Sequence, residues 1–264
     1  MAIESSAGTS ADTGAGEGRR YAGADADQRR ERRRAALVEA GLELFGHAGY
    51  AGVSVKRVCE EAGLTQRYFY ESFNDRTGLL IAVYDECVGI ARAATLDAAG
   101  EYLAGDAGLA GEDVPEVARA ALGAFLAALA SDPRRARVIL VEVVGVDPLV
   151  ERVRMDAIHG WADLILAMTR GDRPTSTRQR LAAVGLVGAV TQLLVDWYFG
   201  SVAPLFAGGN TGPSAGVDTG TGETEGADAA ARSPSPAADP GDLETILDVC
   251  VDMFVATHQR LFAD

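Results

Sequence analysis

Hydrophobic residues recur along most of the chain at intervals of three and four positions, which is the spacing of one face of an α-helix. The sequence has no sustained alternation of apolar and polar residues and no short β-branched runs bounded by turns, so the pattern predicts no strands. Residues 1–28 and 207–241 carry few large apolar side chains, and we expect both to be disordered because they cannot offset the entropy of ordering. The pattern therefore predicts an all-α protein with a tail and an insertion.

The N-terminal region is expected to hold closely spaced helices. Ser54 is placed to cap a short helix, and Gly63 supplies the left-handed turn after it. Thr65 is placed to cap the next helix, and Phe69 and Phe73 are assigned to the core. The expected helices cover about Arg29–His47, the segment after Ser54, Gln66–Tyr70 and a long segment from about Arg76. A helix, a glycine turn and a second helix form the helix-turn-helix arrangement.

The C-terminal region is expected to hold longer helices, most of which begin near a proline, a residue favoured in the first helical turn. Five helices are expected here. The first starts at Val114-Pro115, the second runs from Asp132-Pro133 through Val144, and the third runs from Asp147-Pro148 through Met168. The fourth runs from Thr175 to about Val202, and the last starts at Asp242. The apolar stretch Leu181–Val195 is shorter than the ~20 residues of a membrane span, so we interpret it as a buried helix.

Composition and charge narrow the class of protein. The chain of 264 residues is 48% hydrophobic and 23% charged, which is typical of a globular protein and excludes a wholly disordered or fibrous one. The net charge of −14 would repel the phosphates of a nucleic acid if it were spread evenly over the surface. The charge is uneven, however: residues 19–78 hold 11 bases and 9 acids, whereas residues 79–264 hold 13 bases and 26 acids. A local positive patch is therefore available.

Five arginines crowd into six positions at the expected start of the first helix: Arg29, Arg30, Arg32, Arg33 and Arg34. They form either an arm that contacts DNA phosphates or a solvated helix start. The three cysteines lie far apart and form no CxxC pair, so a disulfide framework and a zinc finger are excluded. With no signal peptide in the sequence, we expect a cytoplasmic protein.

The expected third helix carries side chains that suit DNA. A recognition helix presents its N-terminal residues to base edges, and Gln66 and Arg67 occupy that position. Thr65, Tyr68 and Tyr70 carry hydroxyls that can reach phosphate oxygens. We therefore predict that this helix reads double-stranded DNA.

The N-terminal region resembles the DNA-binding domain of the TetR (tetracycline-repressor) family of transcription regulators. The resemblance runs from Leu37 through Leu80 and rests on Gly49-Tyr50, Ser54-Val55, Ala62-Gly63-Leu64-Thr65, Phe69-Tyr70, Phe73 and Leu79-Leu80. It implies a phosphate contact at Tyr70, a helix cap at Thr65 and a basic contact at Arg76. The chain departs from the family pattern at Arg67, where a small residue is common, and at Ser72, where histidine is common.

The resemblance also implies the organisation of the whole chain: a tail at 1–28, a helix-turn-helix DNA-binding domain at 29–75, and a helical-bundle ligand-binding and dimerisation domain at 76–264. It implies a homodimer whose C-terminal domain binds an unknown small-molecule effector and moves the two DNA-reading units apart. One helix-turn-helix per chain and the apolar late helices predict a two-fold dimer on a pseudo-palindromic operator. We expect a repressor, because a compact dimer across a promoter blocks polymerase without an activating surface. The DNA-contact residues expected on both grounds are Arg33, Arg34, Ser54, Thr65, Gln66, Arg67, Tyr68, Tyr70 and Arg76.

Two further sets of residues are candidates for the larger domain. Polar and aromatic residues within apolar runs are candidates for a ligand pocket: Phe125, Glu142, His159, Trp161, Gln192, Asp196 and Trp197. Glu142 is equally well explained by an ion pair with Arg137, and His159 by a satisfied core position. The two last helices carry wide apolar stripes and are candidates for a dimer interface, through Val184, Gly188, Leu247, Cys250, Val251, Phe254 and His258.

Catalysis has little support in the sequence. There is no GxSxG, HExxH or P-loop motif, and the three histidines have no metal-ligand spacing to other ligand types. We therefore expect no catalytic residue, no metal and no cofactor. The alternative is a helical-bundle protein that binds a small molecule, or an enzyme, without specific DNA reading.

Overall fold

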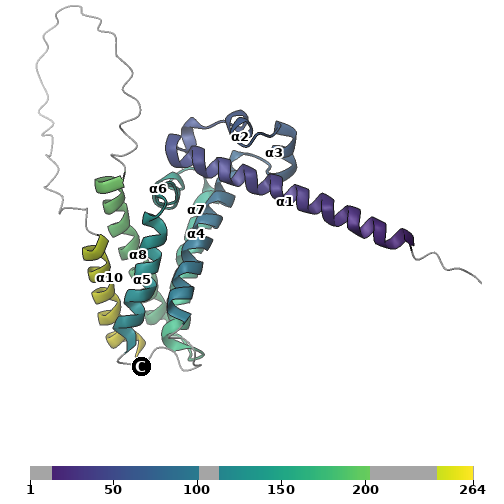
Figure 1. Ribbon diagram of the computed structural model, residues 1–264. Helices are drawn as coiled ribbons and strands as arrows, with labels where there is room; N and C mark the ends of the chain where they lie inside the picture. The colour runs from purple at the N-terminus through teal and green to yellow at the C-terminus, as the bar shows by residue number, and fades with distance from the viewer. Residues whose placement is uncertain (1–13, 101–112, 203–242, 264) are drawn as a thin grey trace, which may run out of the picture.

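The structure is a computed structural model that describes residues 14–100, 113–202 and 243–263. Its described residues form helices and no strands, which confirms the all-α prediction (Figure 1). The elements are α1 (Gly14–Ala48), η1 (Tyr50–Gly52), α2 (Val55–Glu61), α3 (Gln66–Ser72), α4 (Arg76–Gly100), α5 (Val114–Ala130), α6 (Pro133–Arg137), η3 (Val138–Glu142), α7 (Pro148–Arg170), α8 (Thr177–Trp197), η4 (Tyr198–Val202), α10 (Leu243–Thr257) and η5 (His258–Phe262). The expected insertion at 207–241 lies outside the described residues.

The N-terminal domain is built by α1, α2 and α3 against the start of α4. One buried side chain from each helix forms the centre of its core: Phe45, Val58, Phe69 and Leu79 are all fully buried. The glycine turn between α2 and α3 is confirmed, because Gly63 has φ of 63°, a conformation that a side chain disfavours. The burial of Phe69 and Phe73 confirms their assignment to the core.

α1 begins at Gly14 rather than at Arg29, so the prediction of a disordered tail through residue 28 is wrong for residues 14–28. Residues 1–13 lie outside the described residues. Once a helix is nucleated by a packed segment such as Leu37–Phe45, adding a turn costs little, and the alanines and arginines of this stretch favour helix. The prediction relied on apolar content, which does not detect such an extension. In Figure 1 the first turns of α1 run well past α3.

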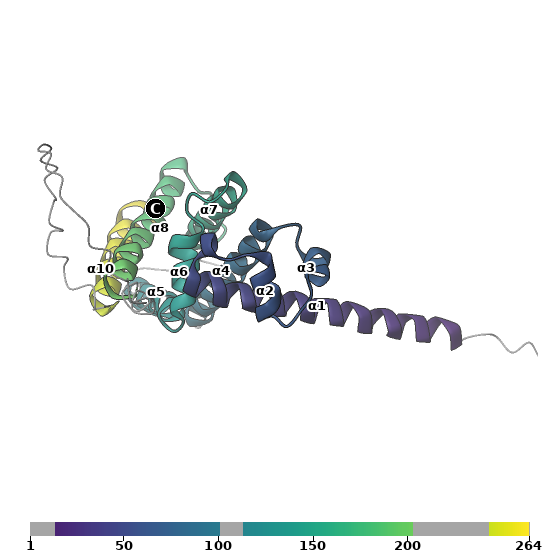
Figure 2. The ribbon, with the colours of Figure 1, turned by 90° about the horizontal axis from the view of Figure 1, so that it is seen from above.

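The C-terminal domain is a bundle of α4, α5, α7, α8 and α10. α5 packs between α4 and α10, and α7 packs along α8 (Figure 2). The predicted helix starts are confirmed by their caps: Asp132 Oδ1 accepts from the Arg134 N–H at 3.1 Å, and Asp147 Oδ1 accepts from the Leu149 N–H at 2.7 Å. α8 begins with a capping box in which Ser176 and Gln179 bond each other's backbone.

The helix expected from Pro133 through Val144 is divided. Five residues of α6 are followed by the π-helical turn η3, Val138–Glu142, and then by Gly145 with φ of 70°. Such π-turns appear frequently at functional sites. Similar π-helical turns, η4 and η5, directly follow α8 and α10.

α8 is not a fully buried helix, contrary to the expectation for Leu181–Val195. One face packs inward through Ala183, Leu186 and Leu194, but Leu181 on the other side is 69% exposed. The segment Thr177–Gly200 is long and apolar enough to cross a membrane by length and composition, and α5 with the α6–η3 segment would be a second, sharply bent candidate. A single apolar helix packed into a bundle is weak evidence for a membrane span. The apolar face that α8 turns outward therefore needs another explanation.

Candidate DNA-binding surface and internal cavity

One face of α3 is buried through an aromatic side chain, and the opposite face carries polar side chains. Phe69 fixes the helix in the core, and Gln66, Arg67 and Tyr70 point away from it into solvent. The Arg67 side chain is 84% exposed and its Nε donates to Glu71 Oε1 at 3.0 Å. Tyr70 is 57% exposed, which is unusual for a large aromatic residue. The face that the sequence assigned to DNA is thus the open face of α3.

The two predicted capping residues differ. Ser54 Oγ accepts from the Arg57 N–H at 3.3 Å, so it caps α2 as expected. Thr65 occupies the N-cap position of α3 with an extended backbone, but its side chain makes no capping hydrogen bond. Its exposed hydroxyl is therefore not engaged in the cap that the resemblance implied.

Two arginines of α1 lie on aromatic rings of the helix-turn-helix. The Arg33 guanidinium lies 4.5 Å from the centroid of the Tyr68 ring, and that of Arg34 lies 5.1 Å from the Phe73 ring. Cation–π contacts of this kind hold α1 against α3. Arg33 is half-buried, whereas Arg29, Arg30, Arg32 and Arg34 are exposed. Arg30 Nη2 donates to Asp27 at 2.6 Å.

Arg76 is placed differently from the expected basic DNA contact. Its Nη1 donates to the Tyr50 carbonyl at 3.0 Å and to the Val53 carbonyl, and its guanidinium lies 4.1 Å from the Tyr50 ring centroid. These bonds tie the start of α4 to η1. The Nη1 group of Arg76 is therefore committed to the protein's own backbone, and a DNA contact through the rest of the guanidinium stays a prediction.

A junction that the sequence did not reveal connects the two domains at η1. Glu142 of η3 is only 11% exposed; its Oε2 accepts from the Tyr50 N–H at 2.6 Å and its Oε1 accepts from Arg137 Nε at 2.7 Å. Arg137 Nη1 donates in turn to the His47 carbonyl at 2.9 Å. One turn away, Arg134 Nη1 donates to Glu43 at 2.7 Å. α6 and η3 are thereby fastened to the end of α1.

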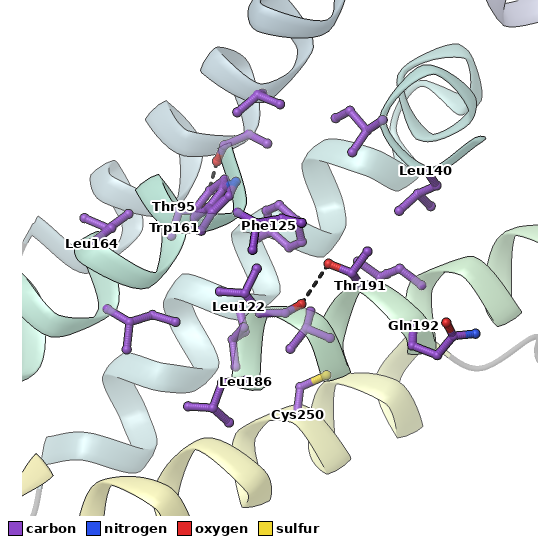
Figure 3. Close-up of a pocket in the computed structure, with 18 of the residues that line it drawn as sticks. Thr95, Leu122, Phe125, Leu140, Trp161, Leu164, Leu186, Thr191, Gln192 and Cys250 are labelled. Carbon is purple, nitrogen blue, oxygen red and sulfur yellow. Dashed lines mark hydrogen bonds between the residues drawn. The ribbon is translucent and has the colours of Figure 1, made fainter. Parts of the chain in front are cut away.

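The C-terminal domain encloses a cavity of about 650 Å³ among α4, α5, η3, α7, α8 and α10. Its wall is mostly aliphatic and aromatic. In Figure 3, Phe125 and Trp161 lie together on one side of the cavity, with ring centroids 5.1 Å apart, while Leu186 and Cys250 lie on another. The volume falls within the range of sites for drug-sized ligands.

Few polar groups face this cavity. Arg154 of α7 is the charged side chain in its lining, and Tyr84 of α4 contributes a buried phenol. Burial raises the pKa of Tyr84 to about 12, so the hydroxyl stays protonated at neutral pH. Burial likewise raises the pKa of the Cys250 thiol to about 11, which keeps it a poor nucleophile.

The structure brings together only part of the predicted pocket. Phe125, Trp161 and Gln192 line the cavity. Glu142 lies outside the lining, where it forms the ion pair with Arg137 that the sequence left open. His159 and Asp196 are exposed, so neither lines the cavity and His159 is no core residue. Trp197 is buried in the hydrophobic core beside the cavity lining.

The predicted dimer residues of α10, and His258 of η5, face the interior of their own chain. Leu247 packs in the core, Cys250 and Phe254 line the cavity, and Val251 and His258 are buried. Both sides of α10 carry apolar residues, so its periodicity did not identify the inner side. On α8, Val184 is half-buried and Gly188 is exposed, so these two stay available to a partner.

In the part of the chain that the structure describes, no three histidine, cysteine or acidic side chains lie close enough together to hold a metal ion.

Comparison with known proteins gives a family for the N-terminal domain and a fold for the chain. Residues 37–83 match the family model described as "Bacterial regulatory proteins, tetR family". No curated protein matches the chain.

Several solved structures are similar. The fatty acid degradation regulator FadR from Bacillus halodurans is 18% identical, with 67% of this chain and 95% of that chain covered and a TM-score of 0.52. A TetR-family transcriptional regulator from Mesorhizobium loti is 17% identical over 87% and 98% of the two chains, with a TM-score of 0.52. A transcriptional regulator from Pseudomonas aeruginosa is 19% identical over 88% and 94%, with a TM-score of 0.51.

At these identities the structural likeness shows the shared fold, while the family model matches the residues of the helix-turn-helix itself. Residues 37–83 are therefore similar to the DNA-binding domain of the tetR family of bacterial regulatory proteins, and the chain shares the fold of these solved transcription regulators.

Proposed function

We propose that this protein is a sequence-specific DNA-binding repressor, released from its operator by a small molecule bound in the internal cavity. The observation that carries the proposal is the dual role of η3. Ile139, Leu140 and Val141 line the cavity, while the next residue, Glu142, holds the backbone of Tyr50 in the DNA-binding domain. A ligand in the cavity therefore contacts the segment that positions the DNA-binding domain.

DNA reading is assigned to the open face of α3. Gln66 can form two bonds to adenine and Arg67 two bonds to guanine, and both side chains are exposed at the N-terminal end of the helix. Tyr70, Thr65 and Ser54 surround them with hydroxyls suited to phosphate. Arg33 and Tyr68 act as a stacked pair at the edge of this face, where the guanidinium stays 27% exposed.

A homodimer explains the outward apolar face of α8. Gly185 and Gly188 lie on this face, and a Cβ at either position would have no atom within 4 Å in the single chain. Small residues allow close approach of a second helix. Leu181 of α8 and Val249 of α10 are large apolar side chains exposed on the same two helices. A two-fold dimer through these faces would present two α3 helices to a pseudo-palindromic operator.

Repression is the favoured mode of regulation, and no reaction is assigned to the protein. A compact dimer lying across a promoter excludes polymerase without a dedicated activating surface. The cavity wall offers no acid–base pair or activated nucleophile among the described residues, since Tyr84 and Cys250 hold their protons. The protein would act in the cytoplasm, where its DNA partner lies.

Selection of bound duplexes from a random-sequence pool tests the proposal. We expect enrichment of a pseudo-palindrome whose half-sites are separated by about one helical turn or a multiple of it. Deletion of the gene should raise expression of a reporter under a promoter with that sequence. A pool without enrichment would favour the alternative of a helical ligand-binding protein or enzyme that does not read DNA, and a reporter that falls on deletion would mean activation.

A further inference from the structure

The lining of the cavity indicates the chemistry of its ligand. We propose that the cavity takes a largely apolar molecule carrying one carboxylate, and that Arg154 binds this carboxylate. The inference rests on the proposed function only in taking the cavity as the effector site. It adds the chemical class of the effector, which the fold alone does not give.

The apolar part of the ligand is inferred from the hydroxyls of the wall. Thr95 Oγ1 donates to the Ala91 carbonyl at 2.8 Å and Thr191 Oγ1 donates to the Val187 carbonyl at 2.7 Å, as the dashed lines in Figure 3 show. These hydroxyl protons are used within their own helices. Between them the wall is formed by Leu122, Phe125, Trp161 and Leu186. A hydrogen-bond acceptor placed in this part of the cavity would lose its water without gaining a donor.

The charged end of the ligand is inferred from Arg154. Its Nε donates to Glu151 Oε2 at 3.1 Å and its Nη2 also bonds this carboxylate, so Glu151 occupies one edge of the guanidinium. Nη1 makes no hydrogen bond to any residue that the structure describes, and the side chain is only 25% exposed. An arginine has five donors, and a half-buried one with an open edge favours an anionic acceptor.

Two further observations favour an anion over a cation or a neutral group at this end. Among the described lining residues none is acidic, so a cationic ligand would find no counter-charge. The Tyr84 phenol interacts electrostatically with Arg154 and is a protonated donor at neutral pH. Arg154 therefore offers a carboxylate a positively charged donor, and Tyr84 offers it a neutral hydroxyl donor.

The position of Arg154 also relates this ligand to regulation. Tyr84 and Val153, which flank the Arg154 end, belong to the core cluster that includes Phe45 and Leu79 of the DNA-binding domain. A carboxylate held there would lie at the junction of the two domains, while the apolar body would reach toward Cys250 and Phe254. Binding would then link α7 and α4 on the cavity side of that junction.

The cavity carries its own reporter for the test. Of the two tryptophans, Trp161 lies in the wall and Trp197 lies in the core beside it. Trp197→Phe leaves Trp161 as the single fluorophore. In this background the affinities of dodecanoate, dodecanol and dodecyltrimethylammonium are measured by Trp161 fluorescence, below the micelle concentrations. The three probes share an alkyl chain and differ in the charge of the head.

Dodecanoate is expected to bind about 10- to 100-fold more tightly than dodecanol, the gain typical of a hydrogen bond to a charged group, and the cation is expected to bind most weakly. Arg154→Gln should remove the preference for the carboxylate and leave dodecanol binding within about threefold, since only the head group loses a partner. Arg154→Lys, which keeps the positive charge, should keep part of the preference. Arg152→Gln is the matched control, because Arg152 is exposed on the same helix and outside the lining.

Equal affinities for dodecanoate and dodecanol, an unchanged preference in Arg154→Gln, or no binding of any of the three would overturn the inference. Selection of an operator by the same protein would then leave the proposed function standing. Loss of operator selection with an intact carboxylate preference would have the opposite meaning. Circular dichroism of each variant shows that the compared proteins are equally folded.

Discussion

The Glu142 carboxylate is bound to the Tyr50 backbone N–H at 2.6 Å, across 92 residues of sequence and across the boundary of the two domains. Its second oxygen holds Arg137, which reaches the carbonyl of His47 at the end of α1. These four residues connect α6 and η3 to the corner where α1 ends. Because η3 also contributes to the cavity wall, this connection links the cavity to the DNA-binding domain.

Removing this connection should cost stability. Glu142→Ala leaves the Tyr50 N–H and the Nε of Arg137 without their acceptor in a site with little solvent, and we expect the free energy of unfolding to fall by about 1–3 kcal/mol in denaturant titrations. Glu39→Ala is the control, since its 3.2 Å pair with Arg134 is largely exposed and should contribute less than about 1 kcal/mol. Equal losses in the two variants would show that the buried junction contributes no more than a surface pair.

The contact of α1 with α6 should control operator binding. A Cβ on Gly46 would lie 2.4 Å from Cβ and 2.9 Å from Cα of Arg134, so Gly46→Ala must separate the two helices. We expect operator affinity in fluorescence anisotropy to fall about 10-fold, which corresponds to about 1.4 kcal/mol and lies within the 1–3 kcal/mol typical of overpacking.

Gly52→Ala is the control for that variant, because a Cβ there has nothing within 4 Å. Its operator affinity should stay within about twofold, as expected of a substitution that forces no displacement. If Gly46→Ala bound the operator as tightly as the control, the α1–α6 contact would not position the DNA-binding domain.

Base reading and phosphate binding should separate on α3. Gln66→Ala and Arg67→Ala are each expected to cost about 1–3 kcal/mol of operator binding and to relax the base preference at one position. Tyr70→Phe removes one hydroxyl and should weaken all duplexes alike. Repeating the pool selection with each variant measures both effects. Unchanged sequence logos for Gln66→Ala and Arg67→Ala would assign base reading to other residues.

The exposed arginines of α1 should contribute through charge alone. Arg33 and Arg34 lie on aromatic rings, so the test replaces Arg29, Arg30 and Arg32 together by glutamine. The slope of log affinity against log salt should flatten by about two to three units per chain, at about 0.9 for each phosphate that an arginine no longer neutralises, with the preferred sequence unchanged.

Arg178 and Arg180 provide the comparison for this effect, because they are exposed at the start of α8, in the other domain. Replacing them by glutamine should leave the slope as it is. An equal flattening in both variants would mean that net charge, and no arginine arm, sets the salt dependence.

The helix starts could be predicted because their signals are local. The side chains of Ser54, Asp132 and Asp147 each accept a hydrogen bond from a backbone N–H two or three residues ahead. On α3, Phe69 points into the core and the neighbouring Tyr70 points to solvent, as expected for a helix with one buried face. The matching of residues 37–83 to one family model reflects the same compact set of signals.

The remaining features depend on contacts that no local pattern encodes. From the sequence, Arg76 is a charged residue at the start of a helix. Its Nη1 donates to the backbone carbonyls of Tyr50 and Val53, which lie more than 20 residues earlier in the chain. Cys250 and His258 lie on an apolar helix with two plausible inner sides, and only the packing of α10 on α5 and α8 decides between them. The helical start of α1 escaped prediction because the sequence of residues 14–28 carries no apolar stripe.

Native mass spectrometry of the protein with its selected duplex shows how many chains and ligands one duplex carries. We expect two chains on one pseudo-palindromic duplex, because one α3 per chain reads one half-site and the α8 faces join the chains. Adding the cavity ligand should convert this complex to free duplex and a ligand-bound dimer. A single chain on the duplex, or a protein–DNA complex that keeps its DNA while carrying the ligand, would rule out a dimeric repressor released by its ligand.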